Sequence, residues 1–155
     1  GANLKASTKA LGAVDLSSQI SETMISSDNF QIVNNSNWQM GMASSLQCGL
    51  QIAQSLGAST VVIGLADQPA INPSSWQRVA SATAPLAVAT YNGVRGNPVR
   101  VHAELWPLLP TTGDEGARSL FKSHQDLLEE IACDGSALDL DTANDIDTLT
   151  RLLRQ

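Results

Sequence analysis

The sequence predicts an α/β domain built as three layers around a mainly parallel sheet. An unbroken, largely β-branched run at residues 60–65 is typical of a strand buried on both faces of such a sheet. Asn72 and Pro73 form a favourable N-cap and first-turn pair for a helix after this strand. Another helix is predicted before it by the apolar stripe of Leu46, Leu50, Ala53 and Leu56. Alternating helices and strands connect parallel strands by right-handed crossovers and cover both faces of the sheet.

The other elements follow from apolar spacing and turn residues. Towards the N-terminus we expect a helix at 4–20, a Ser-rich loop at 17–29 and a strand at 30–33; the helix of the Leu46 stripe then ends near Gly57. Next we expect a central strand at 60–65, a helix at 73–83, strands at 86–91 and 98–102 around a turn-rich segment, and helices at 103–109 and 114–124. Residues 127–132 suit a helix or a strand, and we predict a strand because the segment is short and a turn follows it. A last helix opens at 142–145.

Composition limits the classes of function. The 155 residues, of which 43% are hydrophobic and 15% charged, suit one domain with a single core. The net charge is −6 and the basic residues are scattered, which argues against a nucleic-acid partner. Cys48 and Cys133 stand far apart without zinc-site spacing, which indicates a reducing compartment. With no long apolar span and no leader pattern, we expect a cytoplasmic protein that does not enter membranes.

Three carboxylates are candidate metal ligands. Asp67 directly follows the predicted central strand, where it could hold Mg²⁺, a cation that prefers oxygen ligands. Alternation places Asp139 and Asp141 on one face of their segment, and both could join it. The alternatives are a turn-forming role for Asp67 before Pro69, and solvation or helix N-terminal electrostatics for the other two.

A second group of residues could contact a nucleotide or another anion. Gly41, Ser44 and Ser45 lie at the start of a helix, where backbone N–H groups and hydroxyls suit a ribose, base or phosphate, although simple N-capping is the alternative. Arg95 and Arg118 each lie in a Gly-rich turn, where a guanidinium can grip an anion or form a surface ion pair. The two histidines accompany no nucleophile motif.

These segments together resemble the MobA-like nucleotidyltransferases, and within them the molybdenum-cofactor cytidylyltransferase type. The matching segments are 34–46, which includes Trp38, then 65–69, 91–99, 113–118 and 138–142, in the family's order. The resemblance implies a Rossmann-like fold of the nucleotide-diphosphosugar-transferase type, and an enzyme that transfers CMP from CTP to molybdopterin with Mg²⁺ as cofactor and releases pyrophosphate. It also implies delivery of the product to a molybdoenzyme such as a xanthine dehydrogenase relative.

The resemblance assigns roles to individual residues. Asp67 and Asp141 become the catalytic metal ligands, with Asp139 as a supporting carboxylate. Gly41, Ser44 and Ser45 would lie beside the nucleotide. The residues expected on the pterin-phosphate side are Arg95, Gly96, Asn97, Pro98 and Arg118. Asp114 is expected among the residues that bind the cofactor.

One departure from the family pattern concerns the phosphate-binding loop. Members open with a strand and a Gly-rich loop that ends in a Lys, and this sequence contains no such motif. We therefore expect a single domain without its first strand-loop-helix unit and with little transferase activity, because that loop supplies donors for a triphosphate. Two alternatives stay open: a nucleotidyltransferase that uses GTP or a sugar phosphate, and a non-catalytic module that binds and delivers the molybdenum cofactor.

Overall fold

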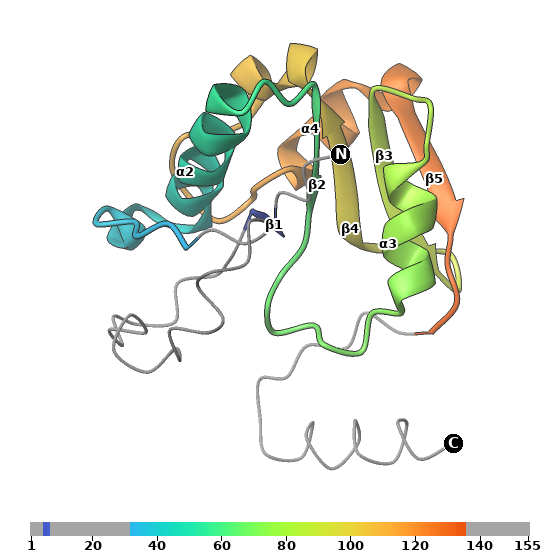
Figure 1. The fold of residues 1–155 in the computed structure, drawn as a ribbon. Helices are drawn as coiled ribbons and strands as arrows, with labels where there is room; N and C mark the ends of the chain where they lie inside the picture. Colours follow the sequence, from blue (N-terminus) through green and yellow to red (C-terminus); the bar gives the residue numbers. More distant parts are fainter. Residues whose placement is uncertain (1–4, 7–31, 136–155) are drawn as a thin grey trace.

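The computed structural model describes residues 5–6 and 32–135, and these form a five-stranded sheet with helices on both faces (Figure 1). The strands lie in the order β1-β2-β4-β3-β5. Their bounds are β1 Lys5–Ala6, β2 Thr60–Ile63, β3 Leu86–Tyr91, β4 Val94–His102 and β5 Leu128–Ala132. The β1–β2 and β3–β5 pairs are parallel, whereas β4 runs antiparallel to both of its neighbours. The predicted α/β architecture is confirmed, and the sheet is mixed.

A tight hairpin explains why β4 runs against the other strands. Asn92 and Gly93 link β3 to β4 with φ angles of 51° and 81°, the left-handed values that a two-residue hairpin turn requires. The prediction that residues 92–97 form a long turn was therefore wrong, since β4 already begins at Val94. The centre of the sheet is β4, and β2, which was predicted to be central, lies between β1 and β4.

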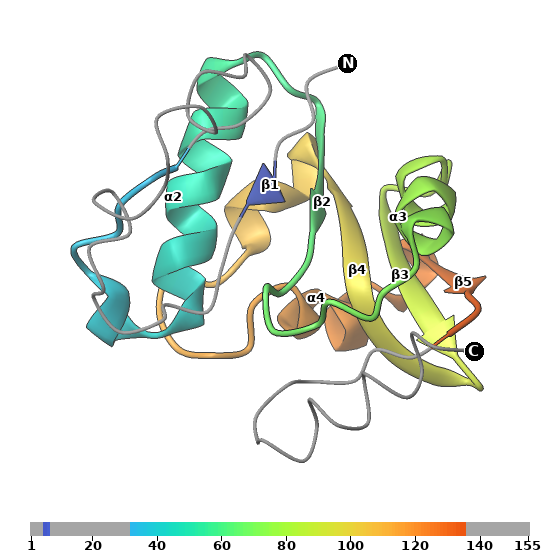
Figure 2. The same cartoon turned by 60° about the horizontal axis from the view of Figure 1, so that its bottom comes forward.

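The helices form the outer layers. They are α2 Met42–Ser55, α3 Pro73–Ala80 and α4 Arg118–Ser123, with short 3₁₀ segments η2 Trp38–Met40, η3 Ala103–Leu108 and η4 Gln125–Leu127. Residues of α2 and α4 pack against one face of the sheet, and Val79 of α3 packs against the other, as the turned view in Figure 2 also shows. Among the described residues, no helix is long and apolar enough to cross a membrane.

Several predicted boundaries hold and others shift. The Asn72 side chain caps α3 by accepting a 3.0 Å hydrogen bond from the Ser74 amide, as its sequence predicts. The helix predicted at 114–124 begins only at Arg118, because Gly113 and Gly116 take left-handed φ angles of 83° and 53°. The segment predicted as a helix at 103–109 is 3₁₀.

Near the N-terminus, the predicted helix and the predicted strand disagree with the structure at the described residues. Lys5 and Ala6 form a strand instead of a helix, because they pair in parallel with β2. Ile32 and Val33 belong to no strand, and both are exposed. The remainder of the expected helix at 4–20, the rest of the strand at 30–33 and the helix at 142–145 lie outside the described residues.

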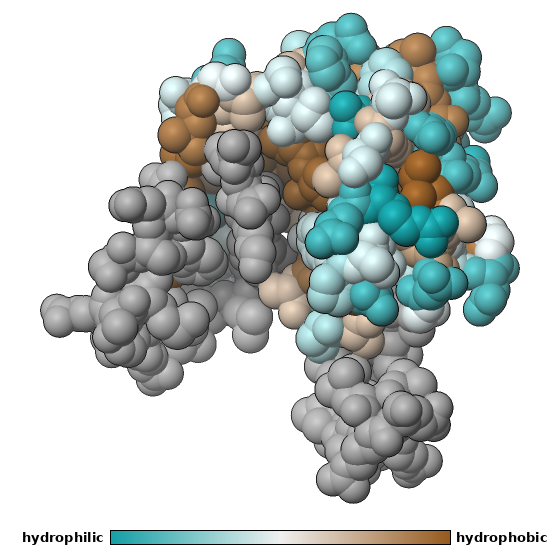
Figure 3. Space-filling model, turned by 45° about the vertical axis from the view of Figure 1, so that its right-hand side comes forward, coloured by the Kyte–Doolittle hydropathy of each residue, from teal (hydrophilic) through white to brown (hydrophobic). Residues whose placement is uncertain are grey.

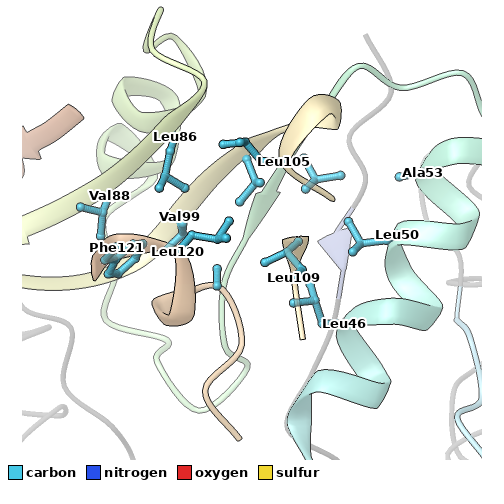
Figure 4. Packing of buried hydrophobic residues seen from close by; sticks show 13 residues of the cluster. Leu46, Leu50, Ala53, Leu86, Val88, Val99, Leu105, Leu109, Leu120 and Phe121 are labelled. Atoms are coloured by element: carbon cyan, nitrogen blue, oxygen red, sulfur yellow. The ribbon is translucent and has the colours of Figure 1, made fainter. Parts of the chain in front are cut away.

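The main core lies between the sheet and the two helices, α2 and α4, that cover one of its faces (Figure 4). All six residues of β3 are buried, and Leu86 and Val88 point into this core. The partners come from α2, β2, β4, η3 and α4, and they include Leu46, Leu50, Val61, Val101, Leu105, Leu109 and Leu120. On the other face of the sheet, the exposed residues of α3 are mostly polar. The side of the molecule in Figure 3 shows many hydrophilic residues with hydrophobic ones among them.

The start of α2 is held by a loop from far along the chain. The Asp114 carboxylate accepts a 2.9 Å hydrogen bond from the Met42 amide, and the Gly113 carbonyl accepts one of 2.9 Å from the Ala43 amide. The Gly113 amide in turn donates to the Met40 carbonyl at 2.9 Å. The contact is so close that a Cβ on Gly41 would lie 2.6 Å from the Gly113 carbonyl oxygen. The loop therefore satisfies helix amides that would otherwise need a ligand or water.

We expect Leu86→Ala to lower the free energy of unfolding by about 2–5 kcal/mol, because it leaves a cavity in a fully buried site. Leu108→Ala makes the same chemical change at a residue that is 51% exposed, so its effect should stay within about 0.5 kcal/mol. Urea denaturation of both variants checks this. Equal losses at the two positions would contradict the assigned core.

We also expect Asp114→Ala to lower the free energy of unfolding by about 0.5–1 kcal/mol, because it removes an anionic acceptor from the start of α2. Glu115→Ala is the matched control, since this neighbouring acidic residue is also exposed and its carboxylate makes no hydrogen bond to α2 among the contacts of the described residues. Thermal and urea unfolding measure both. An effect of Glu115→Ala as large as that of Asp114→Ala would show that general charge, and not the cap, is responsible.

Candidate active site

The carboxyl ends of β1, β2, β3 and β5 lie at one edge of the sheet, toward the bottom of Figure 1. The long loop after β2 and the first residues of β4 meet at this edge. In open α/β sheets, ligands bind outside the carboxyl ends of the strands. This edge is therefore the candidate active site.

Asp67 is placed at this edge by the turn that follows β2. It lies four residues after Ile63, the last residue of β2, and its side chain is half-buried. The next residue, Gln68, is buried at 7% exposure. The backbone hydrogen bonds of the turn are long, since the Gln68 amide lies 3.4 Å from the Leu65 carbonyl and the Ile71 amide 3.4 Å from the Gln68 carbonyl.

A side-chain hydrogen bond joins this turn to β4. The Asn97 amide nitrogen donates to the Gln68 side-chain oxygen at 2.9 Å, and the Tyr91 hydroxyl donates to the Asn97 carbonyl at 2.9 Å. The motif around Asp67 and the motif at residues 95–98 were singled out separately in the sequence, and this bond brings them together. The part that Tyr91 plays was not foreseen, because its partner depends on the hairpin.

The protonation of Tyr91 suits its role as a donor. Burial raises the pKa of its phenol, the Ser75 hydroxyl opposes that rise, and the nearby Cys133 adds to it. The hydroxyl therefore keeps its proton at neutral pH and can donate to the Asn97 carbonyl.

Arg95 is engaged in an ion pair on the opposite face of the sheet from Tyr91. Its guanidinium contacts the Glu130 carboxylate with nitrogen–oxygen distances of 2.7 and 2.6 Å, and it lies 5.8 Å from the centre of the Phe121 ring. Arg95 and Gly96 belong to β4, so the prediction of a Gly-rich turn at this position was wrong. Arg118 is exposed at the first residue of α4.

Ser44 and Ser45 are buried and hold the segment that precedes α2. The Asn35 side-chain amide donates to both hydroxyls, at 2.8 and 2.9 Å. The Ser44 hydroxyl lies 2.8 Å from the Gly41 carbonyl and 3.0 Å from the Asn37 carbonyl, as a donor to either. These contacts shape the loop beside the start of α2. The contribution of Asn35 had no signal in the sequence beyond its place in an Asn-rich turn.

The described residues contribute one of the three predicted metal ligands to this edge. Asp139 and Asp141 lie outside the described residues, and within the described part no group of three or more His, Cys, Asp or Glu side chains could hold a metal ion. Proteins commonly bind Mg²⁺ through one or two carboxylates together with waters and substrate phosphates. A half-buried carboxylate at the end of a strand, as at Asp67, fits such a site.

Comparisons with known proteins agree with this arrangement. Residues 6–127 match the family described as MobA-like NTP transferase domain. The chain is 32% identical over 120 residues to purine catabolism protein PucB of Bacillus subtilis (strain 168). This alignment covers 74% of the chain and 58% of PucB. The chain is 29% identical over 136 residues to nicotine blue oxidoreductase of Paenarthrobacter nicotinovorans, covering 81% of this chain and 64% of that protein. The chain thus spans less than two thirds of the length of each relative.

Solved structures show the same fold. A homologue of Rv0371c from Mycobacterium sp. strain JC1 superposes with a TM-score of 0.61 at 29% sequence identity, over 72% of this chain and 58% of that one. Rv0371c from Mycobacterium tuberculosis H37Rv gives 0.58 at 28% identity, over 73% and 60%. Its complex with manganese gives 0.55 at 27% identity, over 66% and 60%. Since the family match covers well over half of the sequence and agrees with the fold, the chain belongs to the MobA-like NTP transferase family, a family of enzymes.

Proposed function

We propose that the protein transfers CMP from CTP to molybdopterin, the organic part of the molybdenum cofactor, and releases pyrophosphate. The observation that carries this proposal is the hydrogen bond between Gln68 and Asn97, which joins the Asp67 turn to the segment at residues 95–98. By their resemblance, the first of these segments holds the metal and the second contacts the acceptor. A nucleotidyltransferase needs these two parts of its site side by side, because the acceptor must reach the α-phosphorus of the bound nucleotide.

A divalent cation fits the Asp67 edge. Asp67 would hold it, with Asp141 as a second ligand and Asp139 as a supporting carboxylate. When bound, the cation neutralises charge on the triphosphate. That one of the similar mycobacterial structures is a complex with manganese supports a divalent metal here, and we propose Mg²⁺ as the physiological ion.

The other predicted residues take supporting roles in this proposal. Ser44 and Ser45 already bond to Asn35, so we assign them to shaping the loop around Gly41 beside the nucleotide. Asn97 and Pro98 would lie nearest the acceptor. Arg95, Gly96, Asp114 and Arg118 complete the surface on the acceptor side, where the pairs that Arg95 and Asp114 already make keep the loops in place.

The reaction is a substitution at phosphorus. A phosphate oxygen of molybdopterin forms a bond to the α-phosphorus of CTP while the bond from that phosphorus to the bridging oxygen breaks, and the electron pair leaves with pyrophosphate. This chain's residues would align the two phosphates and exclude water, and such positioning accounts for most of the catalysis in phosphoryl transfer.

The names of the two relatives specify neither the acceptor nor the nucleotide of the reaction. One relative is named for purine catabolism and the other for an oxidoreductase activity. Purine oxidation is a setting for molybdoenzymes, which supports a xanthine dehydrogenase relative as the protein that receives the product. Use of GTP or of a sugar phosphate is the alternative within the same fold, and delivery of the cofactor without catalysis is the alternative without chemistry.

Calorimetric titration of CTP and GTP, with and without Mg²⁺, tests the proposal. It should be run on this chain and on a form extended by a family-type Gly-rich loop. We expect the extended form to bind CTP at least about tenfold more tightly than GTP and only with Mg²⁺, and Asp67→Asn to weaken this binding about tenfold or more.

Asp126→Asn is the matched control for Asp67→Asn. Asp126 is exposed in η4 just before β5, at the opposite edge of the sheet, so its loss should leave CTP binding unchanged. Binding of molybdopterin without any nucleotide binding would instead support the delivery module. Tighter binding of GTP would reverse the proposed nucleotide choice.

A further inference from the structure

The hydrogen bond from Asn97 to Gln68 is made by the residue next to Asp67, the proposed metal ligand. We propose that Gln68 and Asn97 are positioning residues that hold the turn carrying Asp67 in place, and so tie the metal ligand to the β3–β4 hairpin. The inference rests on the proposed function only where it concerns metal binding. The structural part, that this hydrogen bond fixes the turn, stands on geometry alone.

The turn at residues 65–71 has long backbone hydrogen bonds. Two backbone hydrogen bonds that the described residues form within the turn measure 3.4 Å each, at the long limit for an N–H···O bond. The bond from Asn97 to the Gln68 side chain measures 2.9 Å, near the optimum. Gln68 is buried at 7% exposure, where water competes little for this bond. The side-chain bond is therefore a stronger local restraint than the backbone bonds.

A bulge in β4 makes this bond available. Val88 pairs with Val99, but the next residue of β3, Ala89, pairs with Gly96. Asn97 and Pro98 are thus the extra residues of the bulge, and their segment departs from the regular ladder. Bulges commonly redirect a side chain towards a functional site. Here the redirected side chain of Asn97 reaches Gln68 in the loop after β2.

The bulge is in turn anchored in the hydrophobic core. The Tyr91 hydroxyl donates to the Asn97 carbonyl, and the Tyr91 side chain is buried against Val79 of α3 and Ala89. A continuous path of contacts therefore runs from α3 through Tyr91 and Asn97 to Gln68 and the turn. An acceptor that binds near residues 97–98 would act on the metal ligand through this path.

Hydrogen exchange tests the structural part of the proposal. In Gln68→Met, a side chain of similar length that cannot accept the bond, we expect the amides of residues 65–71 to exchange about tenfold faster, while those of α2 keep their rates. Asn97→Leu should give the same pattern. Gln68→Glu retains an acceptor for the Asn97 amide and should keep the slow rates.

Titration with Mn²⁺, followed by the electron paramagnetic resonance of the free ion, tests the functional part on this same chain. Gln68→Met should weaken Mn²⁺ binding about tenfold, in the range typical of residues that orient a metal ligand, while urea unfolding shows that the protein stays folded. Gln68→Glu should not weaken it. The double variant Gln68→Met with Asn97→Leu should be no weaker than either single variant, because the two residues act through one bond.

The outcomes separate this inference from the proposed function. Unchanged exchange at 65–71 in Gln68→Met, or additive losses in the double variant, would overturn the positioning role. If the unmodified chain bound no Mn²⁺, the metal-dependent function would fall and with it the effect on the metal ligand, whereas the exchange rates would still decide whether the bond holds the turn.

Discussion

The structure depends on the pairing of β4 with strands on both of its sides. In the order β1-β2-β4-β3-β5, β4 is the link between the β1–β2 pair and the β3–β5 pair. Its hydrogen bonds to β2 and β3 bring together two parts of the chain that would otherwise share only side-chain contacts. The side chains that point from these strands towards α2 and α4 then fill the main core, with Leu86, Val88, Val99 and Val101 fully or almost fully buried. The β3–β4 hairpin and the pairing of β4 with β2 therefore build the sheet on which the helices pack.

The same hairpin determines which polar groups remain for chemistry. The middle of β4 carries the bulge whose Asn97 reaches the Asp67 turn. On the other face of the sheet, Arg95 is held by Glu130 on β5. At the start of α2, the amides of Met42 and Ala43 already bond to Asp114 and Gly113. Many of the polar groups that looked like ligand contacts in the sequence thus hold loops together. Two carboxylates of the described residues follow strands at the carboxyl edge of the sheet: Asp67 is half-buried, whereas Asp134 is exposed and pairs with Arg78.

The predictable parts of the molecule are those set by neighbouring residues. The β-branched run of β2, the Asn72-Pro73 start of α3 and the buried part of the α2 stripe depend on local propensity and burial, and each was found at the predicted place. Two details were wrong: the strand predicted at 60–65 ends at Ile63, and Leu56, predicted to continue the stripe, lies just after α2 and is 56% exposed. The direction of β4 was missed because Gly, Asn and Pro occur together at residues 92–98, and local pattern cannot distinguish a long turn from a two-residue hairpin followed by a bulged strand. The contacts of Asn35, Arg95 and Asp114 are likewise tertiary, since their partners lie 9 to 72 residues away. The roles of Asp139 and Asp141 stay predictions.

The central claim is that a divalent cation binds at the edge where the Asp67 turn meets β4. Paramagnetic broadening by Mn²⁺ in the nuclear magnetic resonance spectrum of this chain measures it most directly, because the effect falls steeply with distance from the ion. The account predicts selective broadening of the side-chain amide signals of Gln68 and Asn97, sharp signals from η3 at the opposite edge, and loss of the effect in Asp67→Asn. Broadening centred elsewhere, or unchanged in Asp67→Asn, would contradict it.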